Sequence, residues 1–78
     1  MKDTLLFILQ KLVDHPDEVR LDEQNDNSKI ILTIHANQQD LGKIIGKSGR
    51  IIKALRDLIK LMAAKENCYV DIVLAEEA

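Results

Sequence analysis

The stretch Ile44-Ile45-Gly46-Lys47-Ser48-Gly49-Arg50-Ile51-Ile52 decides the fold of this chain. Glycine takes positive φ angles at no steric cost and lets another backbone approach closely. Gly46 and Gly49 therefore predict a tight turn that is poor in side chains, and Lys47 adds a positive charge to it. A turn with these properties suits the binding of a phosphate backbone.

The residues before this turn predict a short helix over 41–45. Asn37 is a favourable N-cap residue, and Asp40 follows it at the spacing of a capping box. Gly42 lies inside the helix, where glycine costs about 1 kcal/mol relative to alanine. Its presence indicates that a neighbouring backbone or a ligand comes close to the helix at that point.

The residues after the turn predict a long helix that runs from Gly49 to about Lys65. Apolar side chains recur at helical spacing and form a stripe that we expect to be buried: Ile51, Leu55, Leu58, Ile59 and Met62. Basic side chains project from the opposite side: Arg50, Lys53, Arg56 and Lys60.

Another helix is predicted over Thr4–Asp14, because apolar residues recur there at helical spacing. Asp3 or Thr4 can cap its start, and Pro16 requires it to end shortly before. Phe7 falls on the side away from the apolar stripe. It is therefore either a peripheral core residue or an exposed contact for a second chain.

Two strands are predicted between the first helix and the short one. Val19 and Leu21 belong to a short strand that ends before a polar turn at 24–28, and Lys29–Ala36 forms a clearer strand. The two strands should pair as an antiparallel hairpin. His35 is expected to be an outward-facing strand residue, since no other ligand or catalytic group accompanies it.

The last strand is predicted over 68–74, and a two-helix crossover connects it to the hairpin. A connection of this length allows parallel pairing and is expected to be right-handed. The sequence thus predicts an α+β fold with the order α-β-β-α-α-β, in which three helices cover one face of a three-stranded mixed sheet. Residues 1–78 are expected to form one domain in two layers, whose other sheet face meets solvent or a partner.

Composition excludes several classes of protein. With 46% apolar and 31% charged residues the 78-residue chain is globular, and its apolar runs are much shorter than the roughly 18 residues of a membrane span. No targeting segment is evident at the start, so a cytoplasmic location without a membrane partner is expected. Cys68 is the only cysteine and no motif assembles a nucleophile with a base, so we expect no metal, no cofactor and no enzymatic site.

The net charge of -2 hides a sorted distribution of charge. Acids dominate residues 1–28, whereas residues 43–60 carry the bases Lys43, Lys47, Arg50, Lys53, Arg56 and Lys60 against the acid Asp57. Within a Debye length of about 8 Å, the turn at 46–49 lies in a positive field that attracts a polyanion. The alternative is that these bases form an ordinary solvated helix face.

Two kinds of phosphate-binding loop compete for the glycine-bounded turn. A nucleotide-binding P-loop needs four residues between its first glycine and the Gly-Lys-Ser/Thr group. Here only three residues separate Gly42 from Gly46: Lys43, Ile44 and Ile45. The enclosed residues also have a helical pattern, and no apolar strand ending in an acid is present to hold magnesium. Nucleotide hydrolysis is therefore disfavoured.

The second kind is the helix, Gly-x-x-Gly, helix arrangement of KH domains, whose loop clamps the backbone of about four nucleotides. Residues 44–52 resemble the KH core signature, with aliphatic residues before the first glycine and an aliphatic residue three positions after the second. The element order matches the type II, bacterial KH arrangement. Leu12–Val19 and Leu41–Lys47 further resemble the small stand-alone bacterial KH proteins of the KhpA (YlqC) family, which have a similar length.

The resemblance implies binding of single-stranded RNA by residues that match the family's motif. Gly46, Lys47, Ser48 and Gly49 would form the backbone clamp, Lys43, Arg50 and Lys53 would supply positive charge, and Ile45 and Ile52 would line the groove floor. The strand from Cys68 onward would form the far wall. For the two isoleucines core packing is an equally good interpretation, and the two glycines could form a mere turn between helices.

The resemblance also implies a biological role. Members of the family resemble RNA chaperones or post-transcriptional regulators that form homodimers or pair with a second KH protein, KhpB, and they are linked to cell envelope synthesis and cell shape. Phe7 and Tyr69 are the only aromatic residues, so base stacking should contribute little and one copy should bind weakly. The alternative hypothesis is a KH-fold dimerisation module with little direct RNA binding.

Overall fold

The computed structural model describes residues 1–75 as three α-helices and three β-strands that are joined by short turns. In chain order the elements are α1 (Lys2–Leu12), β1 (Arg20–Asp26), β2 (Lys29–His35), α2 (Leu41–Ile45), α3 (Arg50–Lys65) and β3 (Tyr69–Leu74). Single 3-10 turns precede β1, α2 and α3: η1 (Pro16–Glu18), η2 (Gln38–Asp40) and η3 (Lys47–Gly49). The predicted α+β class and the order α-β-β-α-α-β are confirmed.

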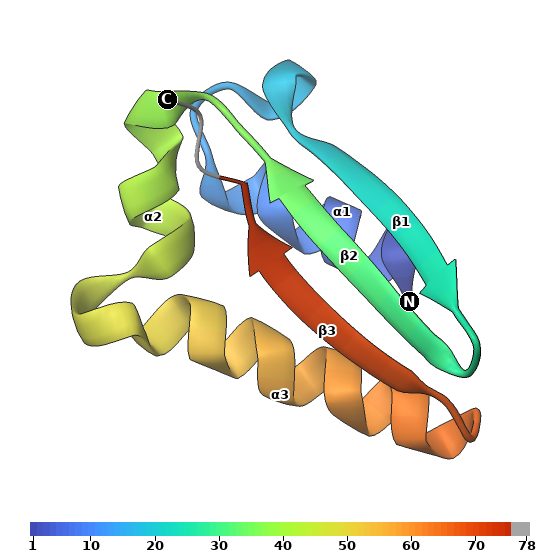
Figure 1. The fold of residues 1–78 in the computed structure, drawn as a ribbon. Coiled ribbons are helices and arrows are strands. Elements are labelled where there is room, and N and C mark those ends of the chain that lie inside the picture. Colours follow the sequence, from blue (N-terminus) through green and yellow to red (C-terminus); the bar gives the residue numbers. More distant parts are fainter. Residues whose placement is uncertain (76–78) are drawn as a thin grey trace.

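The strands form one mixed sheet in the order β1-β2-β3 (Figure 1). β1 and β2 pair antiparallel with Leu21 opposite Ile34, and β2 and β3 pair parallel with Leu32 beside Ile72. β2 is therefore the central strand, as its apolar sequence requires. β3 is an edge strand that the chain reaches through α2 and α3, so the predicted hairpin and crossover are both confirmed.

The first strand is longer than the sequence pattern predicted. β1 continues to Asp26, which pairs with Lys29, so the hairpin turn contains Asn27 and Ser28 instead of residues 24–28. Asn27 adopts a φ of +56°, which asparagine tolerates better than most residues do. Pairing with the apolar strand β2 outweighs the poor strand propensity of the polar residues in β1.

All three helices pack on one face of the sheet. In Figure 1, α1 lies behind β1 and β2, and α3 runs along β3. Alternate strand residues point into the helical layer: Leu21, Leu32, Ile34, Val70 and Ile72. Helical residues complete this core from the other side: Leu5, Leu9, Ile44, Ile52, Leu55, Ile59 and Ala63. Burial of each large aliphatic side chain contributes roughly 1.5–3 kcal/mol, so this single layer of contacts holds the fold together.

The buried stripe of α3 is rotated relative to the prediction. Ile52 and Ala63 belong to the core together with the expected Leu55 and Ile59, whereas Leu58 is 40% exposed. The prediction was wrong only for Leu58, since the expected Ile51 and Met62 are partly buried against the core. Leu58 is accessible because the apolar residues of α3 cover a wider arc of the helix than the sheet does. The residues at one margin of that arc, Leu58 among them, remain accessible.

The first helix also differs from the prediction at its start. α1 begins at Lys2 after Met1, and no side chain caps it, so the expected cap from Asp3 or Thr4 is absent. Its end before Pro16 agrees with the sequence. Phe7 is 60% exposed, so it is not the peripheral core residue that one of the two interpretations expected.

The other sheet face carries polar side chains that pair along β1 and between neighbouring strands. Asp22 lies 2.7 Å from His35 and 3.5 Å from Arg20, and Lys29 lies 3.4 Å from Asp71. His35 thus faces outward on its strand, as the sequence predicts. In the part of the chain that the structure describes, no helix combines the length and the apolar character needed to cross a bilayer.

Candidate nucleic-acid interface

The Gly46–Gly49 loop is built almost entirely from left-handed backbone conformations. Gly46 has a φ of +77°, Ser48 of +56° and Gly49 of +73°. Three backbone hydrogen bonds close the loop. The N–H of Gly46 donates to the carbonyl of Gly42 at 2.9 Å, the N–H of Gly49 donates to the carbonyl of Gly46 at 3.1 Å, and the N–H of Arg50 donates to the carbonyl of Lys47. The chain therefore reverses within four residues and enters α3 directly.

Glycine is required at the first position of the loop for two reasons. A Cβ atom on Gly46 would lie 2.5 Å from Cγ1 of Ile51, which is far inside a normal contact. The backbone angles, with a ψ of 172°, also fall in a region that essentially only glycine populates. By contrast, a Cβ on Gly42 would meet no atom of residues 1–75 within 4 Å, so of the two alternatives for this glycine the close approach of a neighbouring backbone is wrong.

The N-terminus of α3 lies at the loop, where the N–H of Arg50 is bonded to Lys47 and the N–H groups of the next residues follow. This helix has 16 residues, and no side chain accepts a hydrogen bond at its cap residue Gly49. A helix N-terminus carries a partial positive charge, and its leading N–H groups have no partner within the helix. The loop and the helix start together present donors and positive potential at the same place.

The predicted basic residues surround this loop but differ in their partners. Lys47 and Arg50 are exposed, and within residues 1–75 neither forms an ion pair. Lys53 pairs with Asp57 one turn further along α3 at 3.0 Å, and both side chains are largely exposed. Exposed pairs of this kind contribute little, about 0–1 kcal/mol, and a phosphate can displace them.

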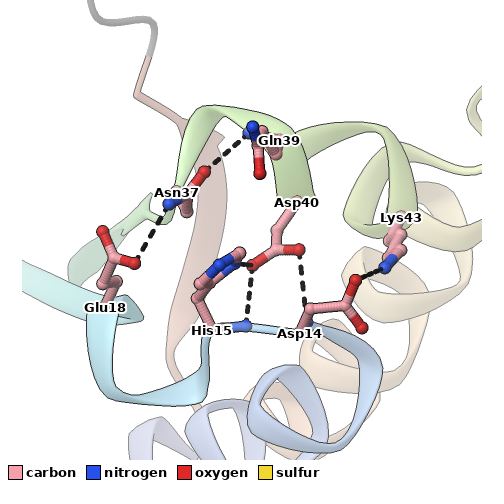
Figure 2. Close-up of polar contacts among 7 residues, drawn as sticks. All are labelled: Asp14, His15, Glu18, Asn37, Gln39, Asp40 and Lys43. Atoms are coloured by element: carbon pink, nitrogen blue, oxygen red, sulfur yellow. Dashed lines mark hydrogen bonds and ion pairs between the residues drawn. The ribbon is translucent and has the colours of Figure 1, made fainter.

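Lys43 is tied to the end of α1, which the sequence alone did not reveal. Its Nζ forms an ion pair with the carboxylate of Asp14, which follows α1 in the chain (Figure 2). Both side chains remain substantially exposed, at 44% for Lys43 and 70% for Asp14. The charge that Lys43 would offer to a phosphate is therefore partly neutralised by an acid within the same chain.

A buried carboxylate positions α2 and with it the start of the loop. The side chain of Asp40 is 1% exposed, and it accepts hydrogen bonds from the backbone N–H groups of Asp14 at 3.2 Å and His15 at 3.0 Å. Nδ1 of His15 lies 3.1 Å from the same carboxylate (Figure 2). Desolvation opposes ionisation of Asp40, but these hydrogen bonds prevail and lower its pKa below the ordinary value.

Asp40 therefore has a different role from the one that the capping-box spacing predicted. Asn37 does act as a cap, because its side chain accepts a hydrogen bond from the backbone N–H of Gln39 at 2.8 Å. Asp40, however, turns away from Asn37 and crosses to the segment after α1. The spacing of polar residues indicated a helix start here, but only the tertiary structure shows which groups the carboxylate binds.

The two isoleucines of the predicted groove floor have different environments. Ile52 is 8% exposed and packs in the core, whereas Ile45 is 36% exposed on the loop side of α2. Ile45 can therefore contact a ligand directly, and Ile52 supports the helix start from beneath.

The basic flank of α3 faces the free edge of β3. Lys53, Arg56 and Lys60 lie on this flank, and Nε of Arg56 donates a hydrogen bond to the carbonyl of Ile72 at 3.2 Å. We call the surface between these three residues and the edge of β3 the α3–β3 strip. The sequence pattern predicts only that Arg56 projects from the basic side of the helix, because the packing of a crossover helix against an edge strand has no local signature.

A Gly-x-x-Gly loop between two helices, on a mixed sheet with the order α-β-β-α-α-β, defines a KH domain of the type II arrangement. The comparison with known families is more specific. The sequence model of the family described as KhpA/KhpB, KH domain, matches residues 2–74, and the chain belongs to this family. KH domains recognise nucleic acid and do not catalyse reactions, so the expectation that the chain is not an enzyme is confirmed.

Individual relatives support the same assignment. The RNA-binding protein KhpA of Chlamydia pneumoniae is 43% identical over 77 residues, which are 99% of this chain and 99% of that protein. The RNA-binding protein KhpA of Clostridium acetobutylicum is 49% identical over 67 residues, which are 86% of this chain and 89% of that protein. The RNA-binding protein KhpA of Halalkalibacterium halodurans is 41% identical over 66 residues, or 85% of this chain and 87% of the relative.

Proposed function

We propose that the chain binds single-stranded RNA by clamping its phosphate backbone at the Gly46–Gly49 loop. The observation that carries the proposal is the loop conformation, with positive φ angles at Gly46, Ser48 and Gly49 directly before the uncapped start of α3. This geometry exposes backbone to a ligand and aims helix N–H groups at an anion. Relatives that carry the name RNA-binding protein support the proposal.

Positive charge and an apolar surface flank the clamp. Lys47, Arg50 and Lys53 lie within the loop or the first turn of α3, and Lys43 and Ile45 lie on α2. These residues would neutralise phosphates, which makes the affinity dependent on salt and largely independent of sequence. Binding by one copy should be weak, because a single KH groove holds only about four nucleotides.

The test is the double variant Lys47→Asp with Ser48→Asp. Aspartate tolerates the left-handed conformation at Ser48, so the fold should persist while the loop repels phosphate. We expect loss of crosslinking to RNA in cells and loss of binding to a labelled oligonucleotide in vitro. Undiminished crosslinking of this variant would sink the proposal.

A matched control places the same change in net charge far from the loop. Lys2→Asp with Thr4→Asp alters two exposed residues in the first turn of α1, where acids are favourable. Met1 borders a surface hollow with Met62 and Glu66, so this turn lies beside the opposite end of α3. The control should retain most RNA binding, which separates a local effect of the loop from a general effect of charge.

We further propose that the protein acts in the cytoplasm as an RNA chaperone or post-transcriptional regulator, as a homodimer or with a KhpB-like KH protein. Two linked sites can raise avidity by about 10² or more, which would offset weak binding by one groove. Exposed apolar side chains on α3 support self-association, since Leu61 is 71% and Leu58 40% exposed. The proposed link to cell envelope synthesis and cell shape rests on the family resemblance alone.

The exposed leucines of α3, Leu58 and Leu61, also favour a second candidate function, a dimerisation module with little direct RNA binding. Salt distinguishes the two candidates. Phosphate contacts make the logarithm of the binding constant fall with the logarithm of the salt concentration, by about 0.7 per contact for single strands, whereas an apolar interface hardly responds.

A further inference from the structure

A hollow lies at the end of α3 that is distant from the Gly46–Gly49 loop. It has a volume of about 520 Å³, and residues of the hairpin turn, of α3 and of the start of β3 line it, among them Asp26, Lys29, Lys60, Tyr69, Val70 and Asp71. A smaller hollow of about 190 Å³ between α3 and β3 is also lined by Lys60, Tyr69 and Val70. The two hollows are therefore adjacent, and Tyr69 lies at their common border.

Tyr69 is the exposed aromatic residue of this region. Its side chain is 77% exposed, although its backbone is fixed at the first position of β3. The backbone N–H of Tyr69 donates to the carbonyl of Ser28 at 3.1 Å, and the residue pairs with Lys29 in the parallel ladder. A ring on a rigid strand that borders hollows on two sides is a platform on which a planar group can stack.

The charges around the larger hollow indicate what kind of group it accepts. The carboxylates of Asp26 and Asp71 offset the amines of Lys29 and Lys60, and Lys29 lies 3.4 Å from Asp71. A hollow with balanced charge is a poor cradle for phosphate but suits an uncharged nucleobase, whose edge carries donors and acceptors. Lys60 forms no ion pair within residues 1–75 and can meet the phosphate that adjoins such a base.

The edge of β3 offers further hydrogen-bonding groups beside this hollow. The backbone N–H groups of Tyr69 and Ala75 point to β2, whereas the carbonyl of Ile72 accepts from Arg56 on the other side. Because backbone groups alternate along a strand, those of Val70 also point away from β2, next to Lys60. A base in the hollow could therefore be held by the strand edge as well as by the ring.

The α3–β3 strip connects the loop to the hollow. Between Gly49 and Lys60 the helix rises by about 16 Å at about 1.5 Å per residue. Four stacked nucleotides span about 14 Å at about 3.4 Å each, so the two lengths agree. A strand clamped at the loop would reach Tyr69 with about its fourth or fifth nucleotide.

We propose that Tyr69 and Lys60 form a further RNA-binding site, in which the ring of Tyr69 stacks on a base near the end of the strand held at the loop. This inference rests on the proposed function, since it needs a strand clamped at Gly46–Gly49. It also revises the expectation from composition that base stacking contributes little, because the position of one aromatic residue matters more than the number of them.

The first experiment compares two substitutions at Tyr69 with fluorescein-labelled octaadenylate, followed by fluorescence anisotropy. Removal of a stacking ring weakens single-strand binding by about fivefold or more, so we expect this effect for Tyr69→Ala. Tyr69→Phe keeps the ring and should bind within about twofold of the original chain. Equal affinities of the alanine variant and the original chain would overturn the inference.

The second measurement observes the ring itself. Tyr69 is the only tyrosine and the chain contains no tryptophan, so the intrinsic emission reports on this one side chain. Unlabelled octaadenylate should quench it, and the Lys47→Asp, Ser48→Asp variant corrects for light absorbed by the nucleotide. If the anisotropy rises without quenching, the stacking site is wrong while the clamp stands.

Two further outcomes are equally informative. If octaadenylate raises no anisotropy with the original chain, the proposed function and the stacking site fail together. If adenosine monophosphate alone quenches Tyr69 at the same concentration as the octamer, the hollow is a mononucleotide site and its assignment to a clamped strand is overturned.

Discussion

At the scale of single residues, the glycines around the loop occupy positions with different steric demands. Gly46 combines backbone angles that other residues avoid with a Cβ position that Ile51 already fills. Gly49 has a φ of +73° but open space around it. Gly42 lies in α2 with open space and ordinary helical geometry. A side chain would therefore meet both crowding and backbone strain at Gly46, only backbone strain at Gly49, and neither at Gly42.

Alanine substitutions should follow this order. We expect Gly46→Ala to lower the free energy of unfolding by about 2–3 kcal/mol and Gly49→Ala by about 1–2 kcal/mol. Gly42→Ala should raise it by about 0.5–1 kcal/mol, because a helical glycine loses more backbone entropy on folding than alanine does. Urea unfolding measures all three, and a Gly46→Ala variant as stable as the original chain would contradict the loop geometry.

The buried carboxylate of Asp40 predicts how stability depends on pH. Its pKa in the folded chain is lower than the ordinary 3.8, so folding favours the ionised form. The stabilisation is therefore fully present above about pH 4 and is lost as the pH falls through the lowered pKa of the folded state. Acid unfolding should show this loss in the original chain and a smaller pH dependence in Asp40→Asn.

At the scale of elements, one ion pair links the end of α1 to α2 beside the loop. If Lys43 contacts phosphate, Asp14 competes with RNA for it. Asp14→Asn should then tighten RNA binding by about two- to fivefold at low salt, because it releases Lys43 and removes a negative charge near the strand. Stability should change by less than about 1 kcal/mol, since the pair is exposed.

The control for this prediction is Asp17→Asn, which removes an equal charge from the exposed turn η1. A tighter complex with Asp14→Asn but not with Asp17→Asn would assign the effect to Lys43. Unaltered affinity of Asp14→Asn would show that Lys43 makes no phosphate contact. Both variants are measured by anisotropy with the same labelled oligonucleotide.

The elements themselves could be predicted from local patterns to a large extent. The apolar alternation of β2 and the glycines of the loop indicated strands, helices and their order, because each pattern has a direct geometric cause. The end of β1 could not be predicted, since the polar residues up to Asp26 are held by pairing with β2. The exposure of Leu58 was also missed, because it depends on how much of the helix the sheet covers.

Local sequence patterns predicted only part of the candidate site. The motif identified the loop and the basic residues near it, which are close in sequence. Asp40, Arg56 and Tyr69 gain their roles from partners that are distant in the chain: the segment after α1, the edge of β3 and the hairpin turn. Contacts of this kind follow from the crossover and leave no local signature.

At the scale of the whole molecule, the surfaces proposed for RNA and for a second copy lie on different sides of α3. Lys53, Arg56 and Lys60 face the edge of β3, whereas Leu58 and Leu61 lie on the side of the helix away from Arg56. A second copy could therefore dock without covering the α3–β3 strip. Phe7 is a less suitable contact, because Nζ of Lys11 lies over its ring, 5.3 Å from the centroid.

Leu61→Glu tests this separation of surfaces. Burial of a new charge opposes docking, so sedimentation should show a monomer for this variant where the original chain self-associates. The self-association of the original chain should respond little to salt. The affinity of the variant for octaadenylate should equal that of the original chain, and both affinities should fall as the salt concentration rises. The affinity of the variant for a long RNA should be lower by about 10² or more, because avidity is lost. Phe7→Glu carries the same charge and should leave the assembly intact. A Leu61→Glu chain that still self-associates would place the interface elsewhere, and equal loss of octamer binding would show that the two surfaces overlap.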